Sequence, residues 1–509
     1  MATFVIRRLI ASIFILLAAT YLMYLLVASS GDPLADLRDS TSPQKAQLME
    51  QRTRLLHLDV PPFLRYFIWI GGVGRCFVGA CDLGVTVQNQ PVTVLLQQAI
   101  SSTLELVTLS QIIAIILGLI IGITTALRQY SGYDYGVTFM AFLFFSLPIF
   151  WVAVLLKQYV AIGFNDFLQA PSIASWVIPI VAVIAGLIWM SILPGKLKSK
   201  LITFGIAAVA TAALLVYMQL SNWFSYPHIG IVGIVLTAAG LAFGVTAIST
   251  GLKNRRALRA SLIVAALGVV AYVPFLYYTV GLPIWGWLGL AVLTVAVSWG
   301  IGWFLGGTDR PPVARTAAIV GFLMGAVISL DRFMQVWDDY SSSGRIKGRP
   351  IATIGSQTPG LEGSLWVHGV DVFTHLLLPT LALILISFAT YTRYSRASLL
   401  EVMNQDYIRT ARSKGLTERT VVVRHAFRNA LIPIATIIAF DIGGIIGGAV
   451  ITERVFGWTG MGALFQNGLD HVDPNPVMAF FLVTGTLAIL FNLIADLVYA
   501  GLDPRIRVS

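Results

Sequence analysis

Long runs of apolar residues alternate with short polar segments along the whole chain. The first run, 9–28, has no charged residue and follows Arg7 and Arg8. Runs of about 20 residues cross roughly 30 Å of hydrocarbon as a helix, and a helix satisfies its own backbone polar groups in lipid. The pattern predicts twelve membrane spans, at 9–28, 103–127, 136–162, 173–193, 201–220, 229–250, 260–280, 284–305, 316–332, 375–392, 432–452 and 477–500.

The first run has a second interpretation, because a secretory signal peptide also begins with basic residues. The apolar core of a signal peptide has about 7–15 residues, which is shorter than this run. The residues that follow, "VASSGDP", make a poor cleavage site. We therefore expect an uncleaved helix whose N-terminus lies inside.

Composition and charge placement agree with a protein that is solvated by lipid. Of the 509 residues, 57% are hydrophobic and 11% are charged, whereas soluble proteins have about 25% charged residues. Most Lys and Arg fall in alternate short segments between the apolar runs, which the positive-inside rule places in the cytoplasm. We predict an all-α polytopic membrane protein with about 12 transmembrane helices, both termini cytoplasmic, and long outer segments at 29–102 and 333–374. The net charge of +10 follows from this topology and does not indicate a nucleic-acid partner.

The two cysteines, Cys76 and Cys81, lie close together in "CFVGAC" in the first outer segment. No histidine is near them, and two cysteines alone do not make a zinc site. Two free thiols and a small disulfide loop are the alternatives. An extracytoplasmic location favours the disulfide, because disulfides persist in oxidising compartments.

Catalytic motifs do not occur in the sequence. It has no Walker A pattern, no HExxH, no GxSxG and no paired Cys/His metal ligands. We therefore expect a protein that is not itself an enzyme and has no metal site. The carboxylate of Asp441, in "AFDIGGIIGGAV", is more informative, because charges inside a bilayer are costly. It either bonds a neighbouring helix, which the glycines beside it would let approach closely, or lines a transport pathway.

The stretch "DYIRTARSKGLTERTVVVRHAFRNALIP", 406–433, is unusually polar and lies on the predicted inner side. Its pattern predicts two short helices joined at Gly415, which suits a helix C-terminus, with Thr417 as N-cap of the second. Such charges either fix the membrane topology alone or form a docking surface. Their number and the helix-turn-helix pattern favour docking.

This stretch, read with the residues before it as "LLEVMNQDYIRTARSKGLTERTVVVRHAFRNALIP", resembles the cytoplasmic loop of binding-protein-dependent ABC importer permeases. It is most similar to the B-type subunit of dipeptide/oligopeptide (and nickel) permeases. The resemblance covers about 1–165 and 360–509, and other matching pieces follow in order: "DPLADLR", "HLDVPPFLRYFIW", "STLEL", "HLLLPTLAL", "GGAVITERVFGWTGMGALF" and "LDPRIR".

The resemblance implies a type I ABC importer transmembrane fold in the bacterial cytoplasmic membrane. It implies a permease subunit for di- and oligopeptides that forms half of the translocation pathway. Its partners would be a second homologous permease subunit, two ATPase subunits (or one fused ATPase), an extracytoplasmic substrate-binding protein and membrane lipid. ATP and Mg²⁺ would bind the ATPase subunits, and this chain would bind no cofactor. The alternative is a 12-helix secondary transporter of small solutes, although such folds are built from repeats and no matching halves are visible.

The resemblance also implies a site and a domain division. The cytoplasmic loop, here 393–431, would dock on an ATPase subunit, and Ala411 and Gly415 match the Ala-x-x-x-Gly core of the family pattern. That pattern begins Glu-Ala-Ala, whereas this chain has Arg409-Thr410-Ala411. The expected domains are an N-terminal permease part at 1–165, an inserted six-helix bundle at 166–335 and a C-terminal permease part at 336–509. The predicted coupling residues are Asp406, Tyr407, Arg409, Thr410, Ala411, Arg412, Lys414, Gly415, Leu416, Glu418 and Arg419.

Overall fold

The computed structural model describes residues 2–193, 195–278 and 281–502. Helices make up nearly all of the regular structure in these residues, and one isolated bridge joins Val85 to Pro91. The chain divides into two compact units, each of which is described separately. Unit 1 comprises 1–161, 353–356 and 375–509, and unit 2 comprises 162–352 and 357–374.

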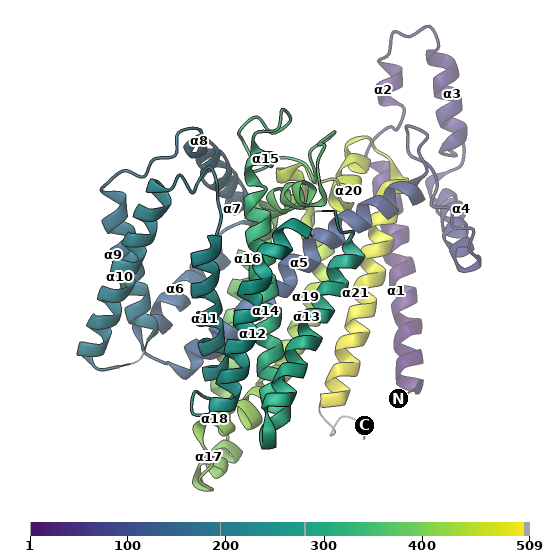
Figure 1. The fold of residues 1–509 in the computed structure, drawn as a ribbon. Coiled ribbons are helices and arrows are strands. Elements are labelled where there is room, and N and C mark those ends of the chain that lie inside the picture. Colours follow the sequence, from purple (N-terminus) through teal and green to yellow (C-terminus); the bar gives the residue numbers. More distant parts are fainter. Residues whose placement is uncertain (1, 194, 279–280, 503–509) are drawn as a thin grey trace. The chain divides into compact units, whose positions relative to one another are not determined.

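Unit 1 contains both ends of the chain. In Figure 1, helices α17 and α18 lie at the same end of this unit as the start of α1 and the end of α21, while α2, α3 and α20 lie at the opposite end. The polar stretch therefore shares a side with both ends of the described chain, as the predicted topology requires. The helices of unit 1 are α1 (Ala2–Ser29), α2 (Ala35–Arg38), α3 (Lys45–Leu55), α4 (Pro62–Gly74), η1 (Arg75–Val78), α5 (Val92–Leu127), α6 (Gly132–Ser146), α7 (Ile149–Leu155), the π-helix η2 (Leu156–Ile162), α16 (Leu365–Met403, in this unit from His375 onward), α17 (Asp406–Ser413), α18 (Glu418–Thr420), the π-helix η4 (Val421–Ala426), α19 (Phe427–Phe456), α20 (Met461–Asp470) and α21 (Pro474–Leu502).

Unit 2 is a bundle whose core is rich in alanine. Ala238, Ala242, Ala257 and Ala260 are buried against Val264 and its neighbours, and small side chains of this kind allow close helix packing in lipid. The helices of unit 2 are α8 (Gly163–Gln169), α9 (Val177–Ile192), α10 (Leu197–Leu220), α11 (Gly230–Ser249), α12 (Arg255–Tyr278), α13 (Ile284–Leu305), η3 (Gly307–Asp309), α14 (Arg310–Gln335) and α15 (Trp337–Ser341).

Membrane-length helices occur at ten places in the described residues, and each overlaps a predicted span, although the one at Val421–Ile438 shares only 432–438 with the predicted 432–452. The other two predicted spans differ from a simple crossing. The span at 136–162 is broken, because α6 and the helix after it meet at 105°. Leu147, at the break, has the extended backbone that a following proline favours, and Pro148 lacks the N–H that a continuous helix needs. The span at 173–193 is helix α9, which has only 16 residues.

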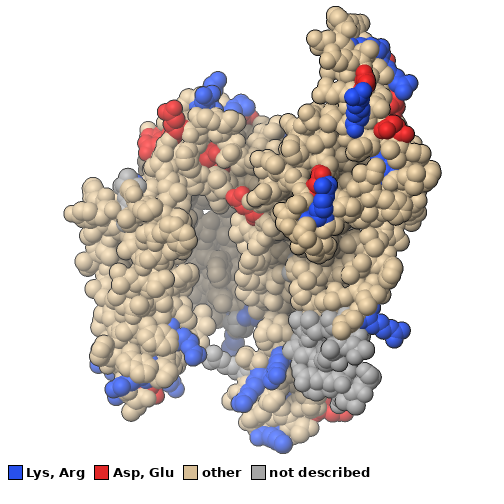
Figure 2. All heavy atoms as spheres, turned by 90° about the vertical axis from the view of Figure 1, so that its right-hand side faces the viewer, with Lys and Arg blue, Asp and Glu red and all other residues tan. Residues whose placement is uncertain are grey.

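The distribution of charged side chains on the surface agrees with these membrane spans. On the face shown in Figure 2, Lys, Arg, Asp and Glu gather near the two ends, and a band of uncharged side chains lies between them. Exposed Leu, Ile, Phe and Val are frequent on the helices of both units. This is the surface expected of helices that face hydrocarbon.

The second outer segment packs with unit 2, which differs from the predicted domain division. Residues 336–352 and 357–374 belong to this unit, although the sequence assigned them to the C-terminal permease part. Trp366 explains the difference, because its ring centroid lies 4.6 Å from that of Trp287 in α13 and 4.5 Å from that of Phe333 in α14.

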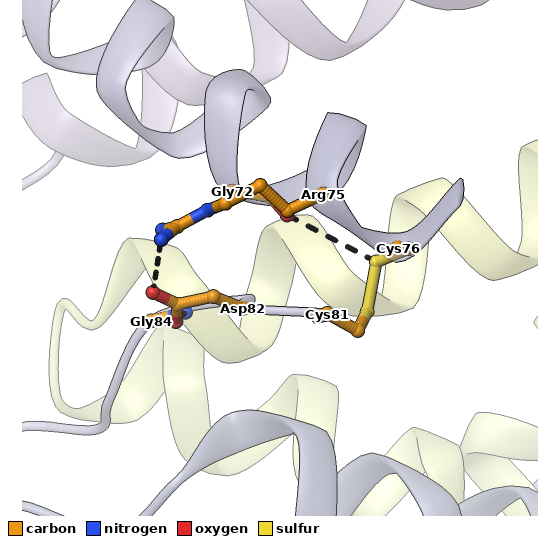
Figure 3. The surroundings of a disulfide bond; sticks show 6 residues. All are labelled: Gly72, Arg75, Cys76, Cys81, Asp82 and Gly84. Atoms are coloured by element: carbon orange, nitrogen blue, oxygen red, sulfur yellow. Dashed lines mark hydrogen bonds and ion pairs between the residues drawn. A yellow bond between two sulfur atoms is a disulfide. The ribbon is translucent and has the colours of Figure 1, made fainter. Parts of the chain in front are cut away.

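The first outer segment contains α2, α3, α4 and η1, and α5 begins at Val92 rather than at the predicted 103. Cys76 and Cys81 form a disulfide beyond the end of α4 (Figure 3). Arg75 Nη2 lies 2.9 Å from Asp82 Oδ2, which closes the same short loop. Glycine is required at Gly72, because a Cβ there would overlap the Asp82 carbonyl oxygen.

Candidate coupling site

Helix α17 is a short exposed helix that ends in a left-handed glycine. Gly415 has φ of +75°, which L-residues other than glycine adopt at a cost. The Gly415 N–H donates to Arg412 O at 2.9 Å, and the Leu416 N–H donates to Ala411 O at 3.4 Å. These two bonds are a Schellman motif, so the predicted helix stop at Gly415 is present in the structure.

One side of α17 is anchored by apolar contacts. Ile408 and Ala411 are buried in a cluster that includes Ala126 at the end of α5, Leu399 in α16 and Val421 in η4. The remaining side faces outward: Tyr407 is 43% exposed, and the Arg409 side chain is 71% exposed. The helix is therefore fixed on the ends of three other helices and presents a polar face.

The turn after α17 is braced by polar contacts. Arg412 donates to both carboxylate oxygens of Glu418, at 2.7 and 3.2 Å. This hydrogen bond to Arg412 lowers the pKa of the Glu418 carboxyl. Thr417 caps the next helix, because its side chain accepts from the Thr420 N–H at 3.4 Å. A pocket of about 630 Å³ lies behind this turn and is lined in part by Arg412 and Glu418.

The second predicted short helix is not a separate element, and this prediction was wrong. Residues 418–456 form one continuous helical path through α18, η4 and α19. Residues 393–403 likewise belong to α16. The separate part of the predicted loop 393–431 is therefore only 404–417. Local sequence could not show this, because the polar first turns of α18 and η4 continue directly into an apolar span.

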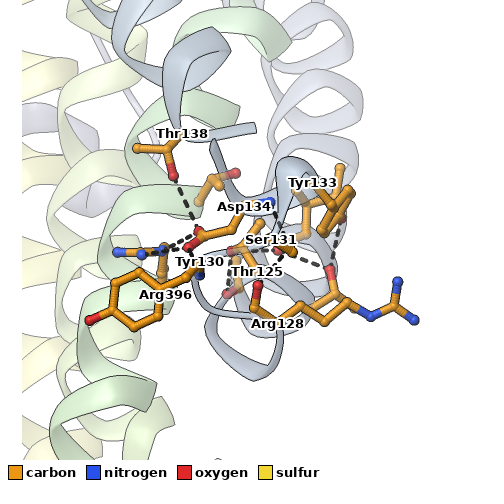
Figure 4. A network of polar contacts seen from close by, with 12 residues as sticks. Thr125, Arg128, Tyr130, Ser131, Tyr133, Asp134, Thr138 and Arg396 are labelled. Carbon is orange, nitrogen blue, oxygen red and sulfur yellow. Dashed lines mark hydrogen bonds and ion pairs between the residues drawn. The ribbon is translucent and has the colours of Figure 1, made fainter. Parts of the chain in front are cut away.

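A buried ion pair joins α16 to α6 close to this site (Figure 4). Arg396 Nε lies 2.8 Å from Asp134 Oδ1, and its Nη2 lies 3.0 Å from Oδ2. Asp134 also accepts from the Tyr130 N–H at 3.1 Å, and its own N–H donates to Ser131 Oγ, which caps α6. The Asp134 side chain is 3% exposed. The sequence analysis missed this pair, whose members are 262 residues apart.

Arg393, one turn before Arg396 on α16, also reaches α6. Its guanidinium carbon lies 4.8 Å from the ring centroid of Phe142 and 4.3 Å from that of Phe145. An arginine at this distance is attracted by the ring face. Two arginines of α16 therefore hold α6, one through a carboxylate and one through aromatic rings.

Helices α5 and α16 pack closely enough to exclude side chains. A Cβ at Gly118 would press on Tyr391, and a Cβ at Gly122 would overlap Ser395 Oγ. Ser395 Oγ donates to Gly118 O at 3.0 Å across the contact. This close approach joins α16 to α5 one turn before Leu399 and Ala126, which contact α17.

Asp441 in α19 bonds to the neighbouring helix α16. Tyr391 in α16 donates to its carboxylate, and Gln111 in α5 donates to the Tyr391 hydroxyl. This is the contact that the packing interpretation of Asp441 expects, while its role in a pathway stays a prediction. The side chains of 439–440 and 442–448, including the neighbouring glycines, lie outside the described residues.

Glu453, at the other end of α19, is a fully buried carboxylate that the sequence analysis did not single out. It accepts from Thr103 Oγ1 at 2.6 Å and from the Gly462 and Ala463 N–H groups at 2.6 and 3.2 Å. It thereby caps α20 from outside that helix. The signal that could have found it is the Gly457 turn in "ERVFGWTGMG", which returns the chain toward Glu453.

The structure thus brings the predicted coupling residues 406–418 together around one exposed helix and its turn. The Arg419 side chain lies outside the described residues. Within the described part of the chain, no group of three His, Cys, Asp or Glu side chains could hold a metal ion. The fold and the site define a class: a multi-pass helical membrane protein with a short polar helix fixed on the ends of its spans.

Comparisons with known proteins identify the class more closely. Residues 314–508 match the family described as "Binding-protein-dependent transport system inner membrane component". This part includes α17 and Asp441, and the match confirms the resemblance to importer permeases and a multi-pass location in the cytoplasmic membrane. It also supports the type I importer fold.

Several relatives are named as peptide permeases. The chain is 44% identical over 155 residues to the oligopeptide transport system permease protein OppB of Mycobacterium tuberculosis (strain ATCC 25618 / H37Rv), covering 30% of this chain and 48% of that protein. It is 42% identical over 177 residues to the dipeptide transport system permease protein DppB of Escherichia coli (strain K12), covering 34% and 52%. The matched part of the chain spans about half the length of each of these two relatives. It is 24% identical to the oligopeptide transport system permease protein AppB of Bacillus subtilis (strain 168) over all of both chains.

Proposed function

We propose that this chain is the membrane-spanning permease subunit of an ATP-driven importer for di- and oligopeptides. It forms half of the translocation pathway together with a second homologous permease subunit. Two ATPase subunits, or one fused ATPase, bind on the inner side and hold the ATP and Mg²⁺. A substrate-binding protein delivers peptides on the outer side.

The observation that carries this proposal is the construction of α17. Its outward face is polar and exposed, and its inward face is locked by Ile408 and Ala411 onto α5, α16 and η4. A surface that only fixed membrane topology would not need this anchoring. The family match and the names of the relatives support a partner ATPase and a peptide substrate.

In the proposed mechanism, the ATPase subunits close on binding ATP and displace α17. The displacement passes through the apolar contact at Ala126 to α5 and along the continuous helix of α16. The Asp134–Arg396 pair transmits it to α6. The pathway then opens outward and receives the peptide, and hydrolysis resets it.

Gly415 offers a sharp test of coupling, because a Cβ at this position would meet no atom within 4 Å in this chain. Gly415→Val therefore acts through backbone strain, which costs about 1–2 kcal/mol in the left-handed region, and through bulk facing the partner. Gly415→Asn is the matched control, because asparagine tolerates this backbone conformation but adds similar bulk.

The assay is peptide uptake and ATP hydrolysis by the full complex in proteoliposomes. We expect Gly415→Val to be inserted in the membrane and to retain basal ATP hydrolysis but to lose peptide uptake. If Gly415→Asn is also inactive, close approach of the partner is the cause; if it is active, backbone strain is the cause. Normal uptake by both variants would contradict the coupling role of this turn.

Purification of the intact complex separates this proposal from the secondary-transporter alternative. An importer permease brings ATPase subunits with it from the native membrane, whereas a secondary transporter does not. Uptake that depends on a proton or sodium gradient and not on ATP would contradict the proposal.

A further inference from the structure

Helix α4 lies beside the outer half of α1. The Tyr66 hydroxyl is 2.9 Å from Thr20 Oγ1 and donates to Leu17 O at 3.2 Å. The rings of Phe67 and Tyr21 lie 6.1 Å apart. The apolar run of α1 ends at residue 28, so Tyr21 lies about 10 Å inside its outer end at 1.5 Å per residue. The apolar part of α4 is therefore level with the outer leaflet.

One face of α4 is apolar and exposed. Phe63, Leu64, Phe67 and Ile68 are between 46% and 60% exposed. A short helix with such a face beside a membrane span belongs in the membrane interface, with its apolar side chains in lipid.

The opposite side of α4 lines a pocket of about 280 Å³. Arg65 and Trp69 are two of its wall residues and are only 8% and 6% exposed. Tyr24, His57, Ile68, Arg75 and Asp82 also line it. Figure 3 shows the Arg75 and Asp82 part of this wall.

Arg65 is a buried cation without a carboxylate partner. Its Nη2 donates to Val60 O at 2.8 Å and to Leu58 O at 3.4 Å, and its side chain bonds the Tyr24 hydroxyl. In the described part of the chain no ion pair includes Arg65, and neither its Nε nor Trp69 Nε1 has a hydrogen-bond partner. A buried charge is stable when an opposite charge and hydrogen bonds compensate it.

The other charges at the pocket do not supply the missing anion. Arg75 and Asp82 pair with each other at 2.9 Å, and His57 adds no negative charge. The pocket therefore carries an excess positive charge at Arg65. An oxyanion would compensate this charge, because guanidinium groups bind phosphate and carboxylate through charge-assisted hydrogen bonds.

We propose that α1, α4 and the disulfide loop form a binding site for an anionic phospholipid of the outer leaflet. The phosphate binds at Arg65, and the acyl chains lie along the exposed face at Phe67. Ile68 connects the two parts, because it lines the pocket and is also 46% exposed on the apolar face. This continuity favours a lipid over a free anion.

Native mass spectrometry of the protein in phosphatidylglycerol nanodiscs and mixed micelles tests the proposal. Wild type should retain one phospholipid more than Arg65→Gln, whose apparent affinity should fall roughly tenfold or more, since hydrogen bonds to charged groups contribute about 1.5–3 kcal/mol. Arg54→Gln is the matched control, because Arg54 lies in the same outer segment, pairs with Glu50 and is exposed; it should retain the lipid. Equal retention by Arg65→Gln and wild type would overturn the proposal.

Two further measurements separate the sources of the anion and the effects of folding. Inorganic phosphate or acetate at millimolar concentration should not displace the lipid; displacement would identify a free-anion site and overturn the lipid assignment. Arg65→Lys keeps the charge but not the fork, so it should fold and bind with intermediate affinity. Phe67→Ser leaves the pocket intact and should also weaken retention, whereas unchanged retention in both variants would refute the two-part site.

Discussion

The ion pair between Asp134 and Arg396 should contribute strongly to the stability of unit 1. Asp134→Asn removes its negative charge and replaces one of the two acceptors that face Arg396 with a donor. Removing one partner of a fully buried pair costs about 3–5 kcal/mol. Arg396 is 30% exposed and can regain some hydration, so we expect a loss of about 2–3 kcal/mol in the free energy of unfolding.

The assay is reversible unfolding in mixed detergent–SDS micelles, followed by tryptophan fluorescence. A double-mutant cycle with Arg396→Gln isolates the interaction, and we expect a coupling energy above about 1 kcal/mol. Glu50→Gln supplies the control, because its exposed pair with Arg54 in α3 should contribute only about 0.3–0.5 kcal/mol.

The result that refutes this reasoning is equally specific. If Asp134→Asn costs no more than Glu50→Gln, the pair is not a strong connection between α6 and α16. A large loss in both single variants without coupling between them would assign the cost to the cap of α6, where Asp134 also accepts from Tyr130. In either case, displacement of α17 would reach α5 and α16 but would not pass to α6 through this pair.

Three other predictions test the site and the outer loops. Gly122→Ala should lower the free energy of unfolding by about 1–3 kcal/mol through overpacking, whereas Gly136→Ala, which meets no atom within 4 Å, should be neutral or slightly stabilising in the same assay. Exchanging the charges in Arg412→Glu/Glu418→Arg should preserve the turn, as judged by hydrogen exchange. It should nevertheless abolish ATPase binding if the partner contacts these outward charges. Burial raises the pKa of the Asp473 carboxyl from 3.8 to about 6, so its contribution to stability is full below pH 3.8 and is lost as the pH rises through 6. Hydrogen exchange of the adjoining loop, corrected for intrinsic rates, should therefore be slower at pH 5 than at pH 7.5, and Asp473→Asn should remove that difference.

Hydrophobic pattern alone located the membrane helices, because a span needs only about 20 apolar residues in a row. It did not give their full lengths. Helix α5 begins 11 residues early, in the partly polar "VTVLLQQAISS", because Leu96 and Ala99 are buried against Met461 and its neighbours. Those contacts lie far away in the sequence, so no local window contains them.

The turn at Gly415 was predictable because its determinants are local. A glycine at the helix end and a threonine at the next N-cap specify the geometry within a few residues. The position of α4 was not predictable in the same way. Arg65 interrupts its apolar run, and only the contacts of Tyr66 with α1 show that the helix reaches the level of the outer leaflet.

The continuous and broken helices of unit 1 determine which membrane helices a displacement of α17 can move. Arg396 lies 7 residues, or about 10 Å of helix, before α16 ends at Met403, and no proline interrupts this part of the helix. Motion at the end of α16 can therefore reach Asp134 and α6. Helix α6 then ends at the Pro148 break, where no continuous hydrogen-bonded path resists bending. The break is therefore the place where α6 can follow α16 while α7 stays packed against α19.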